Sequence, residues 1–240
     1  GLRGPCMTID TACSSALTCT HVAMQALRNK DCTIAVVGAA SIISEPDQSL
    51  NFCRLGALSP EARCKSFDDA ANGYIRSEGV CAMIIKRLSD AQKEGDNILA
   101  IIKGSAVNQD GKSKRLTAPS TVAQGMLHTA ALKNAQLNHN DIDYIEAHGT
   151  GTKVGDPAEV RGLMFAYEKY RNKENPLIIG AIKSNIGHME CNAGMASMFK
   201  VIVGLQHNII PKSIHFHTPN TLIDWENIPL IVAKDNIPWK

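Results

Sequence analysis

A cysteine lies where a short apolar segment meets an amphipathic one. Residues Cys6–Ile9 favour a buried strand, and Ser14–Arg28 carries apolar residues at helical spacing, so Cys13 is expected at the head of a helix. The first N–H groups of a helix lack intrahelical partners, and its dipole places partial positive charge there. Both features favour the thiolate, and the backbone N–H of Cys13 could donate to an oxyanion. Taken alone, such a cysteine is more often a small buried core residue.

Two histidines follow predicted strands in the second half of the chain. His148 lies in the segment Glu146–Thr152, and His188 ends the segment Lys183–His188. Open α/β sheets bind ligands beyond the carboxyl ends of their strands, and a neutral imidazole can donate a hydrogen bond or take a proton near neutral pH. Each histidine alone is as simply explained by an incidental loop position. Their matching positions, with Cys13 at a helix start, favour a shared site.

Apolar strands alternate with amphipathic helices along the chain, which predicts an α/β fold. The predicted strands are 6–9, 33–40, 80–85, 98–107, 144–145 and 176–182, with a polar link at 89–96. Helices are predicted from residue 14, from Thr121 with a capping box, from Asp156 as N-cap before Pro157, and over Met195–Leu205. Continuous apolar strands between helices indicate a mostly parallel sheet covered on both faces.

Composition excludes several classes of protein. Of the 240 residues, 44% are hydrophobic and 20% charged, with a net charge of +2, which argues against a disordered chain and against a nucleic-acid partner. The longest apolar runs, such as Ile34–Ala40, are far shorter than the ~20 residues that span a bilayer, so no membrane partner is expected. The eight cysteines include no C-x-x-C pair, and no secretion signal opens the chain. We therefore expect free thiols, no metal site and a cytoplasmic location.

Together these segments resemble the ketosynthase (β-ketoacyl synthase) domain of polyketide synthases and type I fatty acid synthases. Asp10–Ser15 resembles the nucleophile motif, Glu146–Thr152 with Gly155–Pro157 the first histidine motif, and Lys183–His188 the second. Further matches follow in the family's order: Leu58–Pro60, Phe67–Asp68, Gly73–Tyr74, Ser77–Gly79, Val107–Gly111 and Leu116–Pro119. Several ordered motifs over nearly the whole chain are far more specific than any one of them.

The resemblance implies a thiolase-like α/β/α/β/α layered fold that is incomplete at both ends. Residues 1–120 would be the end of the N-terminal half, with the nucleophile and a connection, and residues 121–240 most of the C-terminal half, with both histidine motifs, in one intimately packed domain. The family normally forms homodimers. Because the match begins just upstream of the nucleophile and stops before the family's C-terminal Gly-rich loop, we expect residues 1–240 alone to be inactive.

The resemblance also implies a decarboxylative Claisen condensation. Cys13 would carry the acyl chain as a thioester, with its own backbone N–H in the oxyanion hole. His148 and His188 would promote decarboxylation of a malonyl-type extender and hydrogen-bond the enolate. Lys183 would support the site electrostatically.

The substrates of such a domain arrive on a carrier. Thr150 and Thr152 resemble the hydroxyls that bind a phosphopantetheine arm, which belongs to an acyl carrier protein. The implied partners are therefore that carrier protein and other synthase domains of the parent chain. No tightly bound cofactor and no metal are expected.

Several alternatives stay open. Gly151–Pro157 leans toward animal-type fatty acid synthases, whereas Val107–Gly111 and Leu116–Pro119 lean toward polyketide synthases, which we favour. A non-catalytic, carrier-docking ketosynthase-like partner is a different class, but such proteins usually lose the nucleophile. A CoA-dependent thiolase would need a second catalytic cysteine and a single histidine motif. Two departures from the family pattern are Arg115 and Cys191-Asn192, which stand where small residues are usual.

Overall fold

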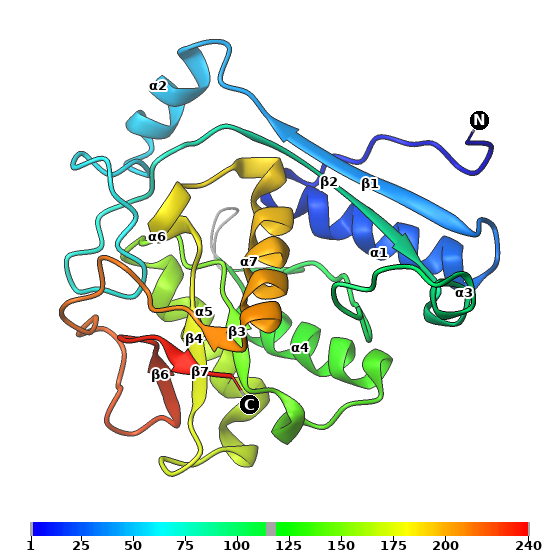
Figure 1. Ribbon diagram of the computed structural model, residues 1–240. Helices are drawn as coiled ribbons and strands as arrows, with labels where there is room; N and C mark the ends of the chain where they lie inside the picture. The colour runs from blue at the N-terminus through cyan, green and yellow to red at the C-terminus, as the bar shows by residue number, and fades with distance from the viewer. Residues whose placement is uncertain (1, 114–118, 240) are drawn as a thin grey trace.

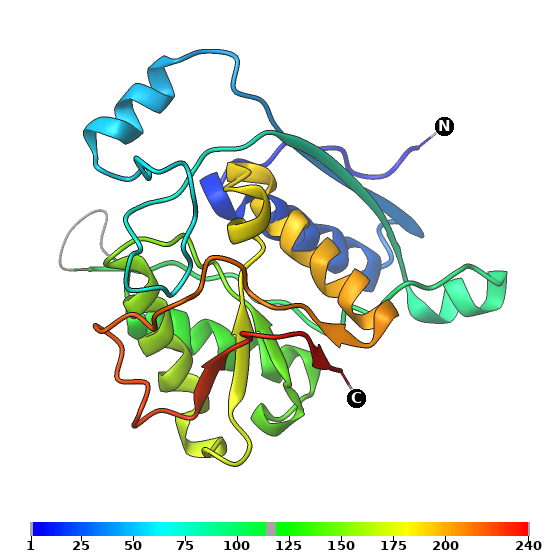
Figure 2. The same cartoon turned by 60° about the vertical axis from the view of Figure 1, so that its left-hand side comes forward.

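The structure is a computed structural model that describes residues 2–113 and 119–239. Arg115 and the first three residues of the motif Leu116–Pro119 lie outside the described residues. Figures 1 and 2 show successive layers: a two-stranded ladder, a pair of helices, a small parallel sheet and a second pair of helices. This order matches four consecutive layers of the expected sandwich.

The helices and strands of the described residues are as follows. The helices are α1 (Ser15–Arg28), α2 (Asp47–Arg54), α3 (Leu88–Glu94), α4 (Thr121–Ala135), α5 (Gly155–Tyr167), α6 (Lys183–Ile186) and α7 (Ala193–His207). The strands are β1 (Ile34–Ser41), β2 (Gly79–Lys86), β3 (Tyr144–Glu146), β4 (Leu177–Gly180), β5 (Ile209–Ile210), β6 (Leu230–Val232) and β7 (Ile237–Pro238).

The first layer is the ladder of β1 and β2. The two strands pair antiparallel, with Val36 opposite Ile84, so the expectation of a mostly parallel sheet is wrong for this pair. Its inward face packs on α1 and α7 through Val37 and its neighbours. Its outward face is apolar and open: Val36, Val80 and Ile84 are 54%, 73% and 68% exposed. Burial on one face explains the alternation along both strands.

The sheet that carries both histidine loops is parallel, as expected. Its strand order is β3-β4-β6, and β3 and β4 run parallel with Ile145 opposite Ile179. Helices α4 and α5 cover one face through a core that includes Leu163, Leu177 and Leu230, each 2% exposed or less. Because the carboxyl ends of β3 and β4 meet at one edge, the loops that follow them are neighbours.

Helices α1 and α7 form the layer between the two sheets (Figures 1 and 2). Gly194, in the first turn of α7, lies against Leu17 of α1: a Cβ there would meet the Leu17 Cγ at 2.5 Å. Only glycine permits this approach, so the two helices pack closely near their N-terminal ends. This contact brings the turn that holds Cys13 beside the turn that follows His188, since the Ala12–Ser14 and Glu190–Asn192 turns are in contact.

Three local predictions differ from the structure. Residues 6–9 and 98–107 form neither helix nor strand, with no ladder partner among the described residues, and most of them are exposed. Apolar β-branched residues favour extended backbone, but a strand also requires a neighbour to bond. The expected link at 89–96 is mostly α3, a short helix that ends at Gly95 in a left-handed conformation.

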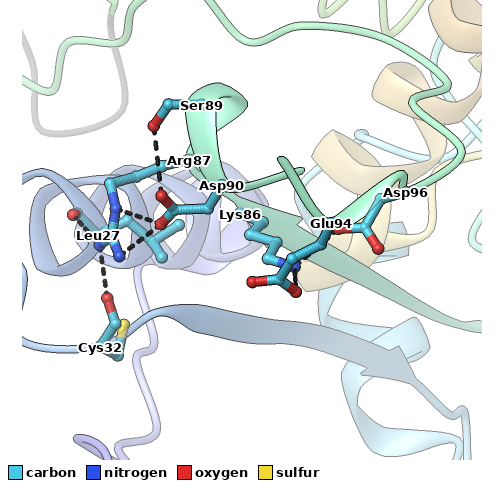
Figure 3. Close-up of polar contacts among 8 residues, drawn as sticks. All are labelled: Leu27, Cys32, Lys86, Arg87, Ser89, Asp90, Glu94 and Asp96. Carbon is cyan, nitrogen blue, oxygen red and sulfur yellow. Dashed lines mark hydrogen bonds and ion pairs between the residues drawn. The ribbon is translucent and has the colours of Figure 1, made fainter. Parts of the chain in front are cut away.

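Charged side chains join β2, α3 and the end of α1 (Figure 3). Arg87 bonds Asp90 and donates from Nη1 to the carbonyl oxygens of Leu27 and Cys32, both at 2.8 Å. The Leu27 carbonyl lies in the last turn of α1, where carbonyls lack helical partners. Lys86 pairs with Glu94 and Asp96. This cluster is at the far end of α1 from Cys13.

Candidate active site

Cys13 lies in a tight turn immediately before α1. The turn Ala12–Ser14 is a 3-10 helix, and Ala12 has a left-handed φ of 54°. Ser15 fixes the turn: its Oγ accepts from the Thr11 N–H at 2.9 Å and donates to the Ala12 carbonyl at 2.7 Å. The predicted strand-to-helix elbow is therefore a coil-to-helix turn, in which Cys13 as a residue is exposed while neighbouring groups crowd its thiol.

The acidity of the Cys13 thiol differs from the expectation. Burial raises its pKa, Lys183 and the backbone N–H of Cys13 itself lower it, and the nearby Glu190 and Cys191 raise it further. The helix start alone predicted a lowered pKa, but removal of solvent from around the sulfur outweighs the favourable charges. The thiol is thus mostly protonated at neutral pH and must lose its proton when it attacks.

His188 is held in one tautomer. Its side chain is buried, and its Nδ1 accepts the backbone N–H of Glu190 at 2.9 Å. A nitrogen that accepts a hydrogen bond carries no proton, so the ring proton of the neutral imidazole is on Nε2. His188 is also fixed by its backbone: its N–H donates to the Ile75 carbonyl at 2.7 Å, and its carbonyl accepts from the Ser77 N–H at 3.0 Å. The result is an oriented N–H donor.

His148 lies beside His188, with ring centroids 5.4 Å apart and planes nearly perpendicular at 86°. Its loop is held by Glu159 of α5, whose Oε1 accepts the His148 N–H at 2.6 Å and whose Oε2 accepts the Gly149 N–H at 2.9 Å. Gly149 has a φ of 46°, and a Cβ there would meet Ala181 at 2.5 Å, so the loop needs glycine. Glu159 lies outside the motifs singled out in the sequence.

Lys183 is 2% exposed, and its charge lowers the pKa of Cys13, His148 and His188 alike, so it lies near all three groups. Burial lowers the pKa of Lys183, and the carboxylates of Glu159 and Glu146 oppose that effect. The field of one buried ammonium therefore covers the whole site.

Glu146 holds the segment that carries Lys183. Its Oε1 accepts the Ile182 N–H at 2.6 Å, and its Oε2 forms an ion pair with Lys200 of α7 at 2.7 Å. Both side chains of the pair are buried, at 5% and 9% exposed. The motif contained Glu146 but gave no sign of this role, because Lys200 lies 54 residues away.

The two imidazoles are neutral at neutral pH. Burial and the charge of Lys183 lower the pKa of His188 to about 3. The same causes, with His188 as a further neighbour, lower the pKa of His148 to about 3, although His148 keeps an exposed surface. Desolvation and a nearby cation both disfavour the imidazolium. Neither ring is charged in the range where proteins ordinarily work, so both can act as neutral donors or acceptors.

The lowered pKa of His188 predicts that the free energy of unfolding decreases as the pH falls. An unfolded histidine has a pKa of about 6.5, whereas that of His188 in the folded protein is about 3. Between these values the unfolded chain binds more protons, so stability is complete above about pH 6.5 and decreases as pH falls, by up to about 1.4 kcal/mol per pH unit. From pH 7 to pH 5 we expect this one group to cost about 2 kcal/mol.

Urea unfolding of the protein at a series of pH values would measure this contribution. His188→Gln should remove this part of the pH dependence while the rest of the curve keeps its shape. If the free energies of unfolding of the natural sequence and of His188→Gln differ by the same amount at pH 5 and at pH 7, the prediction is contradicted.

Thr150 and Thr152 lie next to each other, with their hydroxyl oxygens 3.1 Å apart. The Thr152 Oγ1 accepts the Gly155 N–H at 3.2 Å, at the beginning of α5. Asp156 was expected to cap that helix, but the N-cap residue is Val154. Asp156 is fully buried, and its carboxylate accepts the N–H groups of Phe67 at 2.6 Å and Gly151 at 3.1 Å, with its pKa raised to about 7 by burial. It joins the histidine loop to the segment around Phe67.

The departure Cys191-Asn192 lies directly beside the site. The Cys191 thiol donates to the Ala40 carbonyl at 2.9 Å, and the Asn192 Nδ2 contacts the Cys81 sulfur at 3.4 Å. Asn192 is fully buried, and its Oδ1 has no hydrogen-bond partner among the described residues. The thiol is accommodated by the backbone of β1, whereas nothing in the structure explains the choice of asparagine.

Within 2–113 and 119–239, no group of three His, Cys, Asp or Glu side chains is arranged to hold a metal ion. Two surface hollows of about 350 and 370 Å³ lie beside Arg76 and beside Trp239, and neither is lined by Cys13 or His148.

Among the residues that the structure describes, every helix is too short or too polar to cross a bilayer.

Comparisons with known proteins agree with this geometry. The family model for the β-ketoacyl synthase N-terminal domain matches residues 1–91, and that for its C-terminal domain matches residues 99–217. An erythronolide synthase (EryA3) of Saccharopolyspora erythraea is 46% identical over the whole chain. A phenolphthiocerol/phthiocerol polyketide synthase of Mycobacterium tuberculosis is 43% identical over 99% of it. The chain spans only 8% and 13% of the lengths of these two proteins.

Solved structures give the same result. A ketosynthase domain of oxazolomycin synthesis from Streptomyces albus superposes with a TM-score of 0.95 at 40% identity, over 99% of this chain and 42% of that one. The module 6 ketosynthase of the bacillaene synthase from Bacillus subtilis also has a TM-score of 0.95, at 41% identity, over 100% and 42% of the two chains. The fold is therefore the thiolase-like α/β fold of ketosynthases, as expected. With both family models matched over most of its length, the chain belongs to the β-ketoacyl synthase family.

Proposed function

We propose that this chain carries the active site of a ketosynthase that performs decarboxylative Claisen condensation in polyketide biosynthesis. The observation that carries the proposal is the convergence of the Cys13 thiol with two neutral imidazoles and one buried ammonium. The polyketide pathway is favoured over fatty acid synthesis because the relatives described above are polyketide synthases.

The first half-reaction is acyl transfer to Cys13. The thiol sulfur attacks the carbonyl carbon of an acyl thioester on a carrier protein, the bond to the carrier sulfur breaks, and that sulfur takes the proton which Cys13 loses. The charge of Lys183 stabilises the thiolate as it forms, against the cost of burial. The backbone N–H of Cys13 would donate to the carbonyl oxygen as negative charge develops on it.

The second half-reaction makes the carbon–carbon bond. A malonyl-type thioester loses CO₂, and the electron pair of the broken bond becomes an enolate. His188 donates its Nε2–H to the enolate oxygen, and His148, whose ring lies 5.4 Å away, donates alongside it. The enolate carbon attacks the acyl-Cys13 carbonyl, the C–S bond breaks, and Cys13 leaves as a thiolate that regains a proton. Two neutral donors suit this step because the enolate is stabilised without a proton being consumed.

The remaining assignments are part of the same proposal. Thr150 and Thr152 bind the phosphopantetheine arm of an acyl carrier protein, so the domain requires no tightly bound cofactor of its own. Residues 1–120 and 121–240 belong to the two halves of one packed domain, which acts as a homodimer within a longer synthase. The eight cysteines, all free in the structure, are consistent with a cytoplasmic location.

A single-turnover assay tests the proposal. The complete parent ketosynthase is incubated with an acyl thioester and a malonyl-loaded carrier protein, and intact-protein mass spectrometry follows both partners. We expect acyl-Cys13 to form first, and then a β-ketoacyl carrier protein with release of CO₂. Carrier binding without acyl transfer would instead identify a non-catalytic docking partner.

A further inference from the structure

Arg76, which lies outside the predicted motifs, binds Glu190, the residue whose backbone N–H fixes the tautomer of His188. The Nε and Nη2 of Arg76 donate to the two carboxylate oxygens of Glu190 at 2.5 and 3.0 Å, a two-pronged contact. The side chains of Arg76 and Glu190 are 5% and 19% exposed. A paired guanidinium and carboxylate shielded from water hold each other far more firmly than an exposed pair does.

Glu190 needs such support because of its backbone. Its φ is 46°, in the left-handed region that side chains other than glycine rarely adopt. The N–H of this same residue donates to the His188 Nδ1 at 2.9 Å. If the peptide between Met189 and Glu190 reorients as Glu190 relaxes to an ordinary conformation, this N–H turns away from the ring, and the proton of His188 can then move to Nδ1.

The Arg76 guanidinium is also held by three side chains of α2. Its Nη1 donates to the Ser49 Oγ and its Nη2 to the Gln48 Oε1, both at 2.6 Å, and the guanidinium lies 5.5 Å from the Phe52 ring centre. All three contacts come from α2. The backbone of Arg76 lies beside that of His188 in a parallel β-bridge. The bridge consists of the two hydrogen bonds that His188 forms with Ile75 and Ser77.

We infer that the ion pair of Arg76 with Glu190 is a positioning device, which holds the Glu190 backbone so that His188 keeps its proton on Nε2. Arg76 and Glu190 need not touch the substrate. They act through one backbone N–H. The inference rests on the proposed role of His188 as an Nε2–H donor, and it adds the groups that maintain that role.

The test uses the complete ketosynthase labelled with [¹⁵N]histidine, in which a His188→Gln sample assigns the His188 signals. In the natural sequence, the His188 nitrogens should show a single tautomer protonated at Nε2. In Arg76→Met we expect signals of both tautomers, a roughly 10- to 100-fold slower decarboxylation of malonyl carrier protein, and less than about a two-fold change in acyl loading of Cys13. Arg76→Lys, which keeps the charge but loses the two-pronged contact, should fall between the two.

Arg87→Met is the matched control. Arg87 also pairs with an acid, Asp90, and donates to backbone carbonyls, but at the opposite end of α1. It should lower stability without altering the His188 tautomer. The double variant Arg76→Met with Glu190→Gln should decarboxylate malonyl carrier protein no more slowly than Arg76→Met alone. Each substitution removes the same ion pair, so the second has nothing further to remove.

The outcomes separate this inference from the proposed function. A single Nε2–H tautomer in both Arg76 variants would overturn the inference, even if decarboxylation slowed. A natural sequence that never decarboxylates malonyl carrier protein would contradict the proposed function, whereas the tautomer measurement would still decide the role of Arg76.

Discussion

We expect Cys13→Ala to abolish acyl loading in the complete ketosynthase. The sulfur is the atom that forms the thioester, and the alanine methyl group has no electron pair to replace it. Removal of a nucleophile that acts as a unit with its neighbours costs several orders of magnitude in rate, so we expect a loss of at least about 10³-fold. Intact-protein mass spectrometry after incubation with an acyl thioester measures it directly.

Cys191→Ala is the control for that result. Cys191 lies near enough to affect the pKa of Cys13, but its own thiol donates to the backbone of β1. We expect Cys191→Ala to retain most acyl loading. A Cys13→Ala protein that still accepts one acyl group would place the nucleophile elsewhere, and Cys191 would then be the first thiol to map.

Removal of either imidazole should affect the other half-reaction. In His188→Ala the enolate loses the donor that the structure orients most firmly, because Nδ1 is held by a backbone N–H. Loss of one oriented donor to a developing oxyanion costs about 10²- to 10³-fold. We expect a loss of this size in decarboxylation of malonyl carrier protein, a comparable loss in His148→Ala, and acyl loading of Cys13 that stays within about ten-fold of normal.

The contrast between the two half-reactions is the critical measurement. Release of CO₂ and acyl loading are followed in parallel for Cys13→Ala, His148→Ala and His188→Ala. Equal loss of acyl loading in all three variants would contradict the division of labour. Substitution by glutamine at His188, which leaves a side-chain N–H near the ring position, should restore part of the decarboxylation.

The longer helices α1, α4, α5 and α7 were predictable from the sequence because the forces that define them act over a few residues, whereas the short α2, α3 and α6 were not predicted. Helix α1 was expected from residue 14 and begins at Ser15, and α4 begins at Thr121 as expected, although its N-cap is Ser120. Strands were less predictable. The segment 6–9 has the composition of a strand but no neighbour to pair with among the described residues, and pairing depends on segments far away in the chain.

The candidate site shows the same division. The residue types and their order indicated a thiol, two imidazoles and an amine, and with them the family. The pKa of Cys13 was expected to be lowered by its helix and is raised, because burial depends on every element packed around the sulfur. The roles of Glu146 and Glu159 could not be found from local patterns, since Glu146 binds Ile182 and Lys200, and Glu159 binds the loop of His148 from a helix outside that motif.

By itself, the sequence determined which reactive groups exist and which lie at the ends of helices and strands, since spacing and capping are local properties. Only the tertiary structure decided that these groups meet, which nitrogen of His188 carries the proton and how acidic each group is. Those properties arise from desolvation, Coulomb interactions and hydrogen bonds between residues such as Arg76 and Glu190, which are 114 positions apart. Folding creates these interactions, so no local pattern contains them.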